Sequence, residues 1–241
     1  MKYRPLFLTL LAALSPALTS LHAAEEKPGG YLIYEDGAAG PLPESLEFHH
    51  GSWKFGEGAM IGEQVPTENH MATIKLLMAF DQVKVEWKMK FAVPKQRFLF
   101  VAWPADSTAH AMDFNYIPDT GDFFLVRSKW KDKDSAVLAK GKLTKLDIEW
   151  HELVCVHDGP NFTLTIDGST ITASDEAFSR PMGPFYLNGG GFNGAKFLVK
   201  DLKVSALPGS PTTRKILPSK PAKPAPKPAP SAAPAPAPAA R

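Results

Sequence analysis

Three acidic residues in the second half of the chain have a spacing that would suit the cleavage of a glycosidic bond. Asp147, Glu149 and Glu152 form the run Asp-x-Glu-x-x-Glu. Glycoside hydrolysis uses one carboxyl group as an acid and a second as a base or nucleophile, about 5 to 10 Å apart. The alternative is the solvated start of a strand, where these acids balance Lys142 and Lys145.

A second set of residues combines aromatic rings with polar groups, as sugar-binding faces do. Sugars stack their apolar C–H faces on rings, while a few polar side chains bind the hydroxyls. Asp113 and Asn115 alternate, so on a strand they would share one face. The alternative places the rings in the core and the polar groups at loops. The candidate ligand-binding residues are Arg97, Trp103, His110, Asp113, Asn115, Tyr116, Arg127 and Trp130.

Metal and nucleophile motifs are weaker. Asp119 and Asp122 flank a Thr-Gly turn and are candidate calcium ligands, but calcium needs six to eight oxygens. The histidines show no His-Glu-x-x-His spacing, and no Gly-x-Ser-x-Gly occurs. We therefore expect no cofactor, with calcium as the alternative. Cys155 lies in an apolar run and predicts a buried, inert thiol without a disulfide partner.

Two consecutive β-hairpins are the clearest structural signal. Residues 150–157, 162–166 and 169–172 alternate in polarity and are separated by Asp158-Gly-Pro-Asn161 and Asp167-Gly168. Asp-Gly between such segments favours a type I′ turn, which needs two residues that tolerate positive φ.

Most other segments also predict strands. Residues 81–91 alternate almost perfectly, with Val, Trp, Met and Phe on one face and Lys and Glu on the other. The apolar run 97–103 predicts a central strand, whereas 72–80 is ambiguous between a short helix and a strand. The sequence therefore predicts an all-β, two-sheet antiparallel sandwich that would position both candidate sites.

Both ends differ from the core. Residues 1–24 predict a signal peptide, with Lys2 and Arg4 before a short apolar stretch; the alternative is an uncleaved anchor. Residues 208–241 are rich in Pro, Ala and Lys, which predicts an extended, disordered tail. Residues 30–207 would form one domain. We expect an exported protein, periplasmic or extracellular, without a transmembrane segment once the signal peptide is cleaved.

The charge is unevenly distributed. The formal net charge is +2, yet six basic residues and no acids lie after residue 207, and two basic residues lie before residue 25. Residues 25–207 thus hold 19 basic against 25 acidic residues, a net charge of −6. An acidic core argues against nucleic acid as a partner. The tail could contact an anionic cell wall or envelope, or serve only solubility.

The strand segments carry a family resemblance. Trp53…Gly58-Ala-Met-Ile-Gly62, Val83-Lys-Val-Glu-Trp-Lys-Met-Lys, the hairpins over 150–168, and Gly183-Pro-Phe-Tyr-Leu187 followed by 195–204 resemble the concanavalin A-like lectin/glucanase jelly rolls. Among these, the chain is most similar to the secreted bacterial 3-keto-disaccharide hydrolase domain. The resemblance covers roughly residues 31–207 and implies a jelly roll with a concave face for carbohydrate.

The resemblance leaves the function open. Retaining glucanases of this fold class carry Glu-x-Asp-x-x-Glu, so the triplet at Asp147 departs from that pattern by exchanging its first two acids. A secreted carbohydrate-binding or carbohydrate-processing protein of the bacterial envelope is the leading hypothesis. One alternative is a glycoside hydrolase acting on a 3-keto disaccharide. The other is a non-catalytic structural protein of the envelope.

Overall fold

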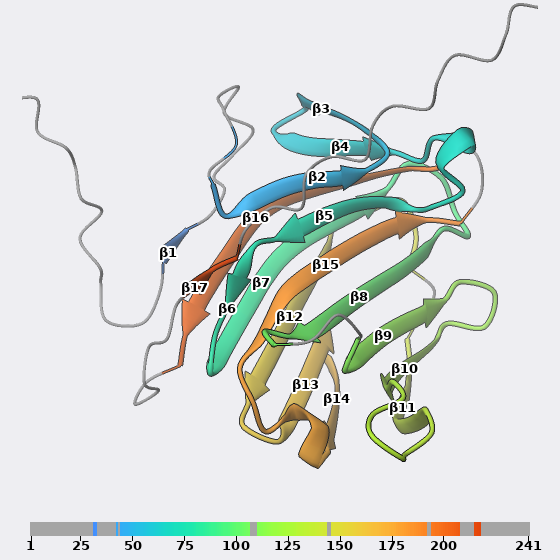
Figure 1. Ribbon diagram of the computed structural model, residues 1–241. Helices are drawn as coiled ribbons and strands as arrows, with labels where there is room; N and C mark the ends of the chain where they lie inside the picture. The colour runs from blue at the N-terminus through green and yellow to red at the C-terminus, as the bar shows by residue number, and fades with distance from the viewer. Residues whose placement is uncertain are drawn as a thin grey trace, which may run out of the picture.

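Two antiparallel sheets pack face to face (Figure 1). The computed structural model describes residues 31–32, 42, 44–106, 110–143, 146–191, 194–207 and 215–217. These residues contain no α-helix, only two 3₁₀ turns, η1 (Pro66–Glu68) and η2 (Glu176–Phe178). The chain is thus an all-β jelly-roll sandwich, as its sequence predicts.

The front sheet, which faces the viewer in Figure 1, has seven strands in the order β11-β10-β9-β8-β15-β5-β2. Their bounds are β2 (Leu46–His50), β5 (Ala72–Leu76), β8 (Arg97–Pro104), β9 (Met112–Ile117), β10 (Asp122–Arg127), β11 (Ala136–Lys142) and β15 (Met182–Gly190). The predicted central strand over 97–103 is confirmed, since β8 is the fourth of the seven. The ambiguous segment 72–80 is strand, because β5 is followed by the short β6 (Met78–Ala79).

The back sheet has the order β14-β13-β12-β7-β16-β4-β3, with β1 also paired to β16. The bounds are β1 (Tyr31–Leu32), β3 (Ser52–Gly56), β4 (Ala59–Glu63), β7 (Gln82–Phe91), β12 (His151–Asp158), β13 (Asn161–Ile166), β14 (Ser169–Ser174) and β16 (Lys196–Ala206). Strand β7 lies between β12 and β16, so the most strongly alternating segment of the sequence has a central place.

Side-chain alternation explains how the layers join. The apolar residues of β7 are buried, while its Lys and Glu residues are only partly buried on the outer face. Trp87 of β7 is 2% exposed and stacks on Phe100 of β8, with ring centroids 5.3 Å apart. Each large apolar side chain buried in this way contributes about 1.5–3 kcal/mol. The alternation that buries one face of the front sheet therefore also determines which side chains its outer face presents.

The two hairpin turns differ in type. Asp167 and Gly168 both have positive φ, 45° and 81°, and close the β13–β14 hairpin as predicted for type I′. In the β12–β13 hairpin Asp158 pairs with Asn161, so the turn residues are Gly159 and Pro160. Gly159 has φ 57°, but the ring of Pro160 fixes a negative φ. This turn is therefore not type I′.

Part of the predicted tail is tied to the domain. The short strand β17 (Lys215–Ile216) pairs with β6, and the Leu217 N–H donates to the Leu77 carbonyl at 2.9 Å. The predicted signal peptide over 1–24 and the remainder of the predicted tail lie outside the described residues. Within the described ranges, no helix is long and apolar enough to cross a membrane.

Candidate functional site

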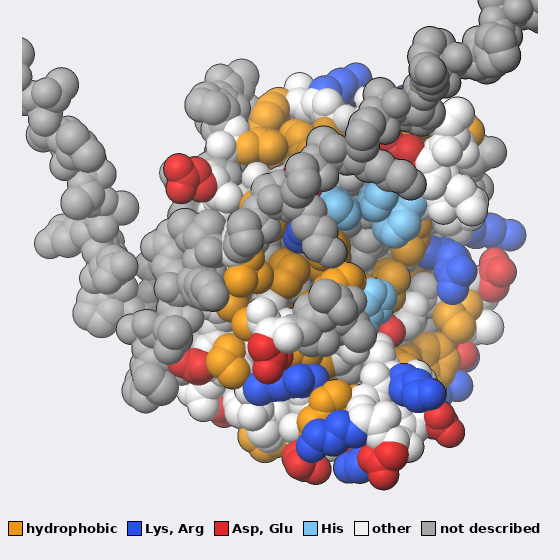
Figure 2. Space-filling model, viewed as in Figure 1, with side chains coloured by type: hydrophobic (Ala, Val, Ile, Leu, Met, Phe, Trp, Pro, Cys, Tyr) orange, Lys and Arg blue, Asp and Glu red, His pale blue; other side chains and the backbone are white. Residues whose placement is uncertain are grey.

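A hollow of about 460 Å³ lies on the outer face of the front sheet. This volume is within the range of small-ligand sites. Figure 2 shows histidine side chains gathered on this face, and four of the seven histidines line the hollow. The lining residues are His49, His50, Gln64, Asn69, His70, Met71, Lys75, Leu99, Val101, Trp103, His110, Tyr186, Asn188 and Gly191.

Strand register brings the floor of the hollow together. Leu99, Val101 and Trp103 alternate on β8, and Tyr186 and Asn188 alternate on the neighbouring β15. Tyr186 lies opposite Val101 on one side and opposite Lys75 of β5 on the other. The side chains of these paired residues point to the same face of the sheet on all three adjacent strands. Residues that are distant in sequence therefore meet at the hollow.

The aromatic side chains form a continuous row across the sheet. The Trp103 ring lies 5.3 Å from Tyr186 and 5.0 Å from His110. The Tyr186 ring lies 6.0 Å from His49, whose own ring is 4.5 Å from that of His50. His50 stacks on His70 at 4.0 Å. His50 and His70 cover each other's faces, so Trp103 and Tyr186, tilted by 35° to one another, are the rings on which an apolar face of a ligand can stack.

A carboxylate lies next to Nδ1 of three of the imidazoles. Glu47 contacts Nδ1 of His49 at 2.7 Å, and Asp113 contacts Nδ1 of His110 at 2.9 Å. Glu68 lies 3.6 Å from Nδ1 of His50. In the two close pairs Nδ1 is engaged, so Nε2 is the ring atom left for a ligand.

The polar groups of the floor are mostly buried. The Thr73 hydroxyl donates to Oδ1 of Asn188 at 2.7 Å, and Asn188 Nδ2 donates to the Leu99 carbonyl at 2.9 Å. Lys75 is only 4% exposed, and its Nζ lies 5.6 Å from the Tyr186 ring centre. Such a network fixes the orientation of side chains that a ligand would contact.

Burial alters the acid–base behaviour of two groups in the row. Burial, together with the charge of Glu47, raises the pKa of Tyr186 to about 12, so its phenol remains a hydrogen-bond donor at neutral pH. Burial, then the neighbouring His70 and His49, lowers the pKa of His50, although Glu68 opposes the shift. His50 is therefore held neutral at physiological pH.

The predicted sugar-binding residues separate into two groups. Trp103 and His110 line the hollow, and Asp113 holds His110 while accepting from the Ser128 hydroxyl at 2.8 Å. Asn115 lies opposite Leu99, and Arg97 lies opposite Gly190 at the exposed start of β8. Asp113 and Asn115 share a face, as alternation predicts.

The other three lie elsewhere, which corrects their grouping with this face. Tyr116 is 1% exposed and points into the core, where its hydroxyl accepts from the Leu146 N–H at 2.8 Å. Alternation accounts for this, since Tyr116 follows Asn115 by one residue. Arg127 is buried, and its Nε lies 3.0 Å from Oδ2 of Asp175. Trp130 packs against Lys131, whose Nζ lies 4.0 Å from the ring centre.

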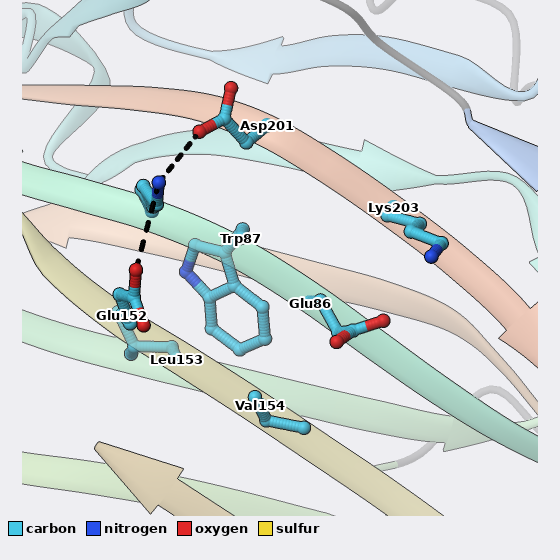
Figure 3. Close-up of a pocket in the computed structure, with 8 residues that line it drawn as sticks. Glu86, Trp87, Glu152, Leu153, Val154, Asp201 and Lys203 are labelled. Atoms are coloured by element: carbon cyan, nitrogen blue, oxygen red, sulfur yellow. Dashed lines mark ion pairs between the residues drawn. The ribbon is translucent and has the colours of Figure 1, made fainter. Parts of the chain in front are cut away.

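The acidic triplet lies at the start of β12 of the back sheet and in the segment just before it, and none of its members lines the hollow. Asp147 accepts from the Glu149 N–H at 2.8 Å and lies 3.4 Å from His151. Glu152, the second residue of β12, points outward, and its carboxylate lies 3.6 Å from Nζ of Lys88. Nζ of Lys88 also lies 3.2 Å from Asp201, and Figure 3 shows Glu152 and Asp201 beside a smaller hollow of about 250 Å³. Asp147 and Glu152 thus contact His151 and Lys88 rather than each other.

The charge partners on the front sheet differ from those expected. Lys142 and Lys140 lie 3.8 and 3.6 Å from Asp122, so Lys142 does not balance the triplet; Lys145 lies outside the described residues. A hydrogen bond with Thr120, helped by these lysines, lowers the pKa of Asp122. Among the described residues, no group of three or more His, Cys, Asp or Glu side chains could hold a metal ion, and Asp119 and Asp122 form no such group.

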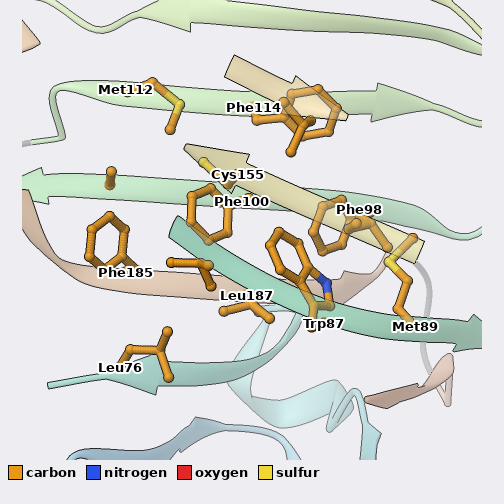
Figure 4. Packing of buried hydrophobic residues seen from close by; sticks show 14 of the residues in the cluster. Leu76, Trp87, Met89, Phe98, Phe100, Met112, Phe114, Cys155, Phe185 and Leu187 are labelled. Atoms are coloured by element: carbon orange, nitrogen blue, oxygen red, sulfur yellow. The ribbon is translucent and has the colours of Figure 1, made fainter. Parts of the chain in front are cut away.

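Cys155 lies in the core (Figure 4) and is fully enclosed. Burial raises the pKa of its thiol well above the usual range, which makes it unreactive in the folded protein. Cys155 is the one cysteine of the sequence, so the hollow has no cysteine nucleophile.

Sequence reasoning missed most of the hollow. Apart from His110, the sequence draws attention to the histidines only through their lack of zinc spacing, and it does not single out Lys75, Tyr186 or Asn188. The glycine run 189–191 indicates a loop, whereas β15 continues through Asn188 to Gly190. The alternation of Tyr186 with Asn188 was a usable signal; the pairing of β5 with β15 was not visible in the sequence.

Comparison with known proteins identifies the architecture. No protein-family model and no curated protein sequence matches the chain. The endo-β-1,3-glucanase of Pyrococcus furiosus matches 75% of this chain and 96% of its own, with 13% identity and a TM-score of 0.55. The fold is the jelly roll of such proteins. The CBM2 module of evolved Dit from Lactobacillus casei BL23 phage J-1 matches 76% of this chain and 98% of its own, with 10% identity and a TM-score of 0.54.

A third similar structure is the carbohydrate-binding module CBM66 from Bacillus subtilis. It matches 67% of this chain and 96% of its own, with 16% identity and a TM-score of 0.51. At these identities the likeness shows the fold alone, and function has to be argued from the hollow.

Proposed function

We propose that the hollow on the front sheet binds carbohydrate. The observation that carries the proposal is the ring row, in which Trp103 and Tyr186 lie 5.3 Å apart on the outer face of a sheet, flanked by His49 and His110. Sugars present apolar C–H faces and a rim of hydroxyls. Rings stack on the former, and imidazole, phenol and amide groups bind the latter.

The names of similar structures support this class of ligand without identifying a member. Two of them are carbohydrate-binding modules, and one is an endo-β-1,3-glucanase. An alginate lyase has also been solved with its substrate, at 9% identity and a TM-score of 0.51. We extend to this chain only the broad class, carbohydrate, and place its action at the bacterial envelope because of the predicted signal peptide and Pro/Ala tail.

A second candidate function is cleavage of a 3-keto disaccharide, which the resemblance implies. The specific observation in its favour is the pair His49–Glu47 beside Tyr186. A keto group acidifies the adjacent C–H bonds, so an imidazole base and a protonated phenol suit that chemistry. Ordinary acetal hydrolysis needs two facing carboxylates, and the described carboxylates around the hollow contact histidines instead. No observation favours the third alternative, a structural envelope protein.

A glycan panel that includes 3-keto disaccharides tests both candidates, with binding and product release measured together. Trp103→Ala and Tyr186→Ala should each weaken binding at least tenfold, about 1.4 kcal/mol, because each removes a ring of the row. Trp130→Ala is the matched control, since that ring lies outside the hollow. Circular dichroism confirms that each variant is folded.

The outcomes separate the candidates. Binding without products supports a binding module. Product release that His49→Gln abolishes, with binding kept, supports cleavage. Binding that Trp130→Ala weakens as much as Trp103→Ala does would place the ligand elsewhere and contradict the proposal.

A further inference from the structure

The groups around the hollow give it a charge whose sign depends on the histidines. Four imidazoles line it, and one lysine, Lys75, lies in its floor. Three carboxylates lie against these imidazoles, contributed by Glu47, Glu68 and Asp113. With all imidazoles neutral, one positive and three negative charges leave a net charge of −2. With all four protonated, five positive charges against the same three leave +2.

The remaining charged or titratable neighbours do not alter this reversal. Tyr186 stays protonated at pH 5 and at pH 8, because its pKa is raised to about 12. Arg97, opposite Gly190 at the rim, adds one positive charge in both states. The charged and titratable groups around the hollow belong to strands β2, β5, β8, β9 and β15, to η1, and to the segments that precede β5 and β9.

The close packing of three imidazoles concentrates the change. His49, His50 and His70 have ring centroids 4.5 and 4.0 Å apart in succession. Burial and the two neighbouring imidazoles lower the pKa of His50, because a positive charge on one ring of this cluster disfavours a charge on the next. A bound anionic group would offset that repulsion, so acidic conditions favour an anionic ligand at this part of the hollow.

We propose that the hollow changes its ligand class with pH, favouring neutral glycans at neutral pH and glycans that carry carboxylate or sulfate groups under acidic conditions. This inference rests on the proposed carbohydrate-binding function and deepens it. The acid state presents imidazolium donors to an anion. The neutral state presents ring nitrogen acceptors to hydroxyls and repels anions through its excess carboxylates.

The test measures affinities of the full chain at pH 8.0 and pH 5.0. The probes are a panel of neutral polysaccharides and their acidic counterparts, including native and carboxyl-reduced polygalacturonate and dextran with dextran sulfate. The basic tail keeps its charge between these pH values, so its own attraction for acidic polymers does not change. His50→Gln/His70→Gln removes two of the stacked imidazoles. His151→Asn is the matched control, because His151 lies on the back sheet.

We expect the preference for acidic over neutral members to rise at least tenfold from pH 8.0 to pH 5.0, in the unmodified chain and in His151→Asn. In His50→Gln/His70→Gln the rise should be threefold or less. An unchanged preference, or a rise that survives in the double variant, overturns the switch but leaves carbohydrate binding intact. A folded protein that binds no panel member at either pH overturns both.

Discussion

His157 shows what burial does to an imidazole outside the hollow. It is fully buried between the sheets, and its Nε2 contacts the Phe178 carbonyl at 2.8 Å. Burial lowers its pKa below the ordinary value of 6.5, although backbone hydrogen bonds oppose the shift. The folded protein therefore favours the neutral ring, whereas the unfolded chain protonates it as the pH falls through 6.5.

This sets the sign of a pH effect on stability. The contribution of neutral His157 is fully present above pH 6.5 and is lost as the pH falls from 6.5 through the lowered folded value. The unfolding temperature should therefore be lower at pH 5.0 than at pH 7.5. In His157→Gln, which carries no titratable ring, the decrease should be smaller, as thermal unfolding at both pH values would show. An identical decrease in the variant would assign the pH dependence to other groups.

For single residues, the sequence predicts which face of a strand a side chain occupies wherever local alternation decides it. Asp113 and Asn115 share the outer face because they are two residues apart. The same rule places Tyr116 in the core, so the sequence alone is enough to exclude Tyr116 from the ligand-binding residues. His49 and His70 meet at one hollow only through the pairing of β2 with β5, a tertiary fact without a local signal.

Two glycines, one in a turn and one in a strand, test how the backbone and the packing of these elements contribute to stability. Gly168 has φ 81° and open space where a Cβ would lie, so Gly168→Ala introduces backbone strain alone, about 1 kcal/mol. Gly189 on β15 has ordinary φ, but a Cβ there would lie 2.3 Å from the Phe197 ring. Gly189→Ala should cost about 3 kcal/mol, because the core must shift to admit the methyl group. Urea unfolding measures both, and a larger loss for Gly168→Ala would contradict this account of the packing.

The elements themselves were largely predictable. The alternation over 81–91 and the Asp167-Gly168 turn carry their own physical cause, namely one buried face and two positive φ values. The type I′ prediction is wrong for the turn at Gly159-Pro160, because Asp158 pairs with Asn161 and the turn therefore consists of Gly159 and Pro160 instead of Asp158 and Gly159. The β6–β17 pairing was missed because two residues leave almost no pattern.

For the whole molecule, the two sheets offer two different outer surfaces. The back sheet carries ion pairs around Lys88, whereas the front sheet carries the row of rings and imidazoles. The jelly-roll fold positions either surface for a ligand and does not choose between them. The central claim is that the front sheet is the one that binds carbohydrate.

The five tryptophans report on this choice directly. Trp103 lines the front hollow, and Trp150 lies beside Lys200 of the back sheet, whose Nζ is 4.3 Å from its ring centre. The indole of Trp87 is buried against Phe100 in the core, and Trp53 and Trp130 line neither hollow. The measurement is a titration of the chain with the glycan that binds best, following the five indole N–H signals by nuclear magnetic resonance. The Trp103 signal, assigned by its loss in Trp103→Phe, should shift with saturation while the other four stay in place. A shift of Trp150 with Trp103 unmoved would contradict the account and place the ligand on the back sheet.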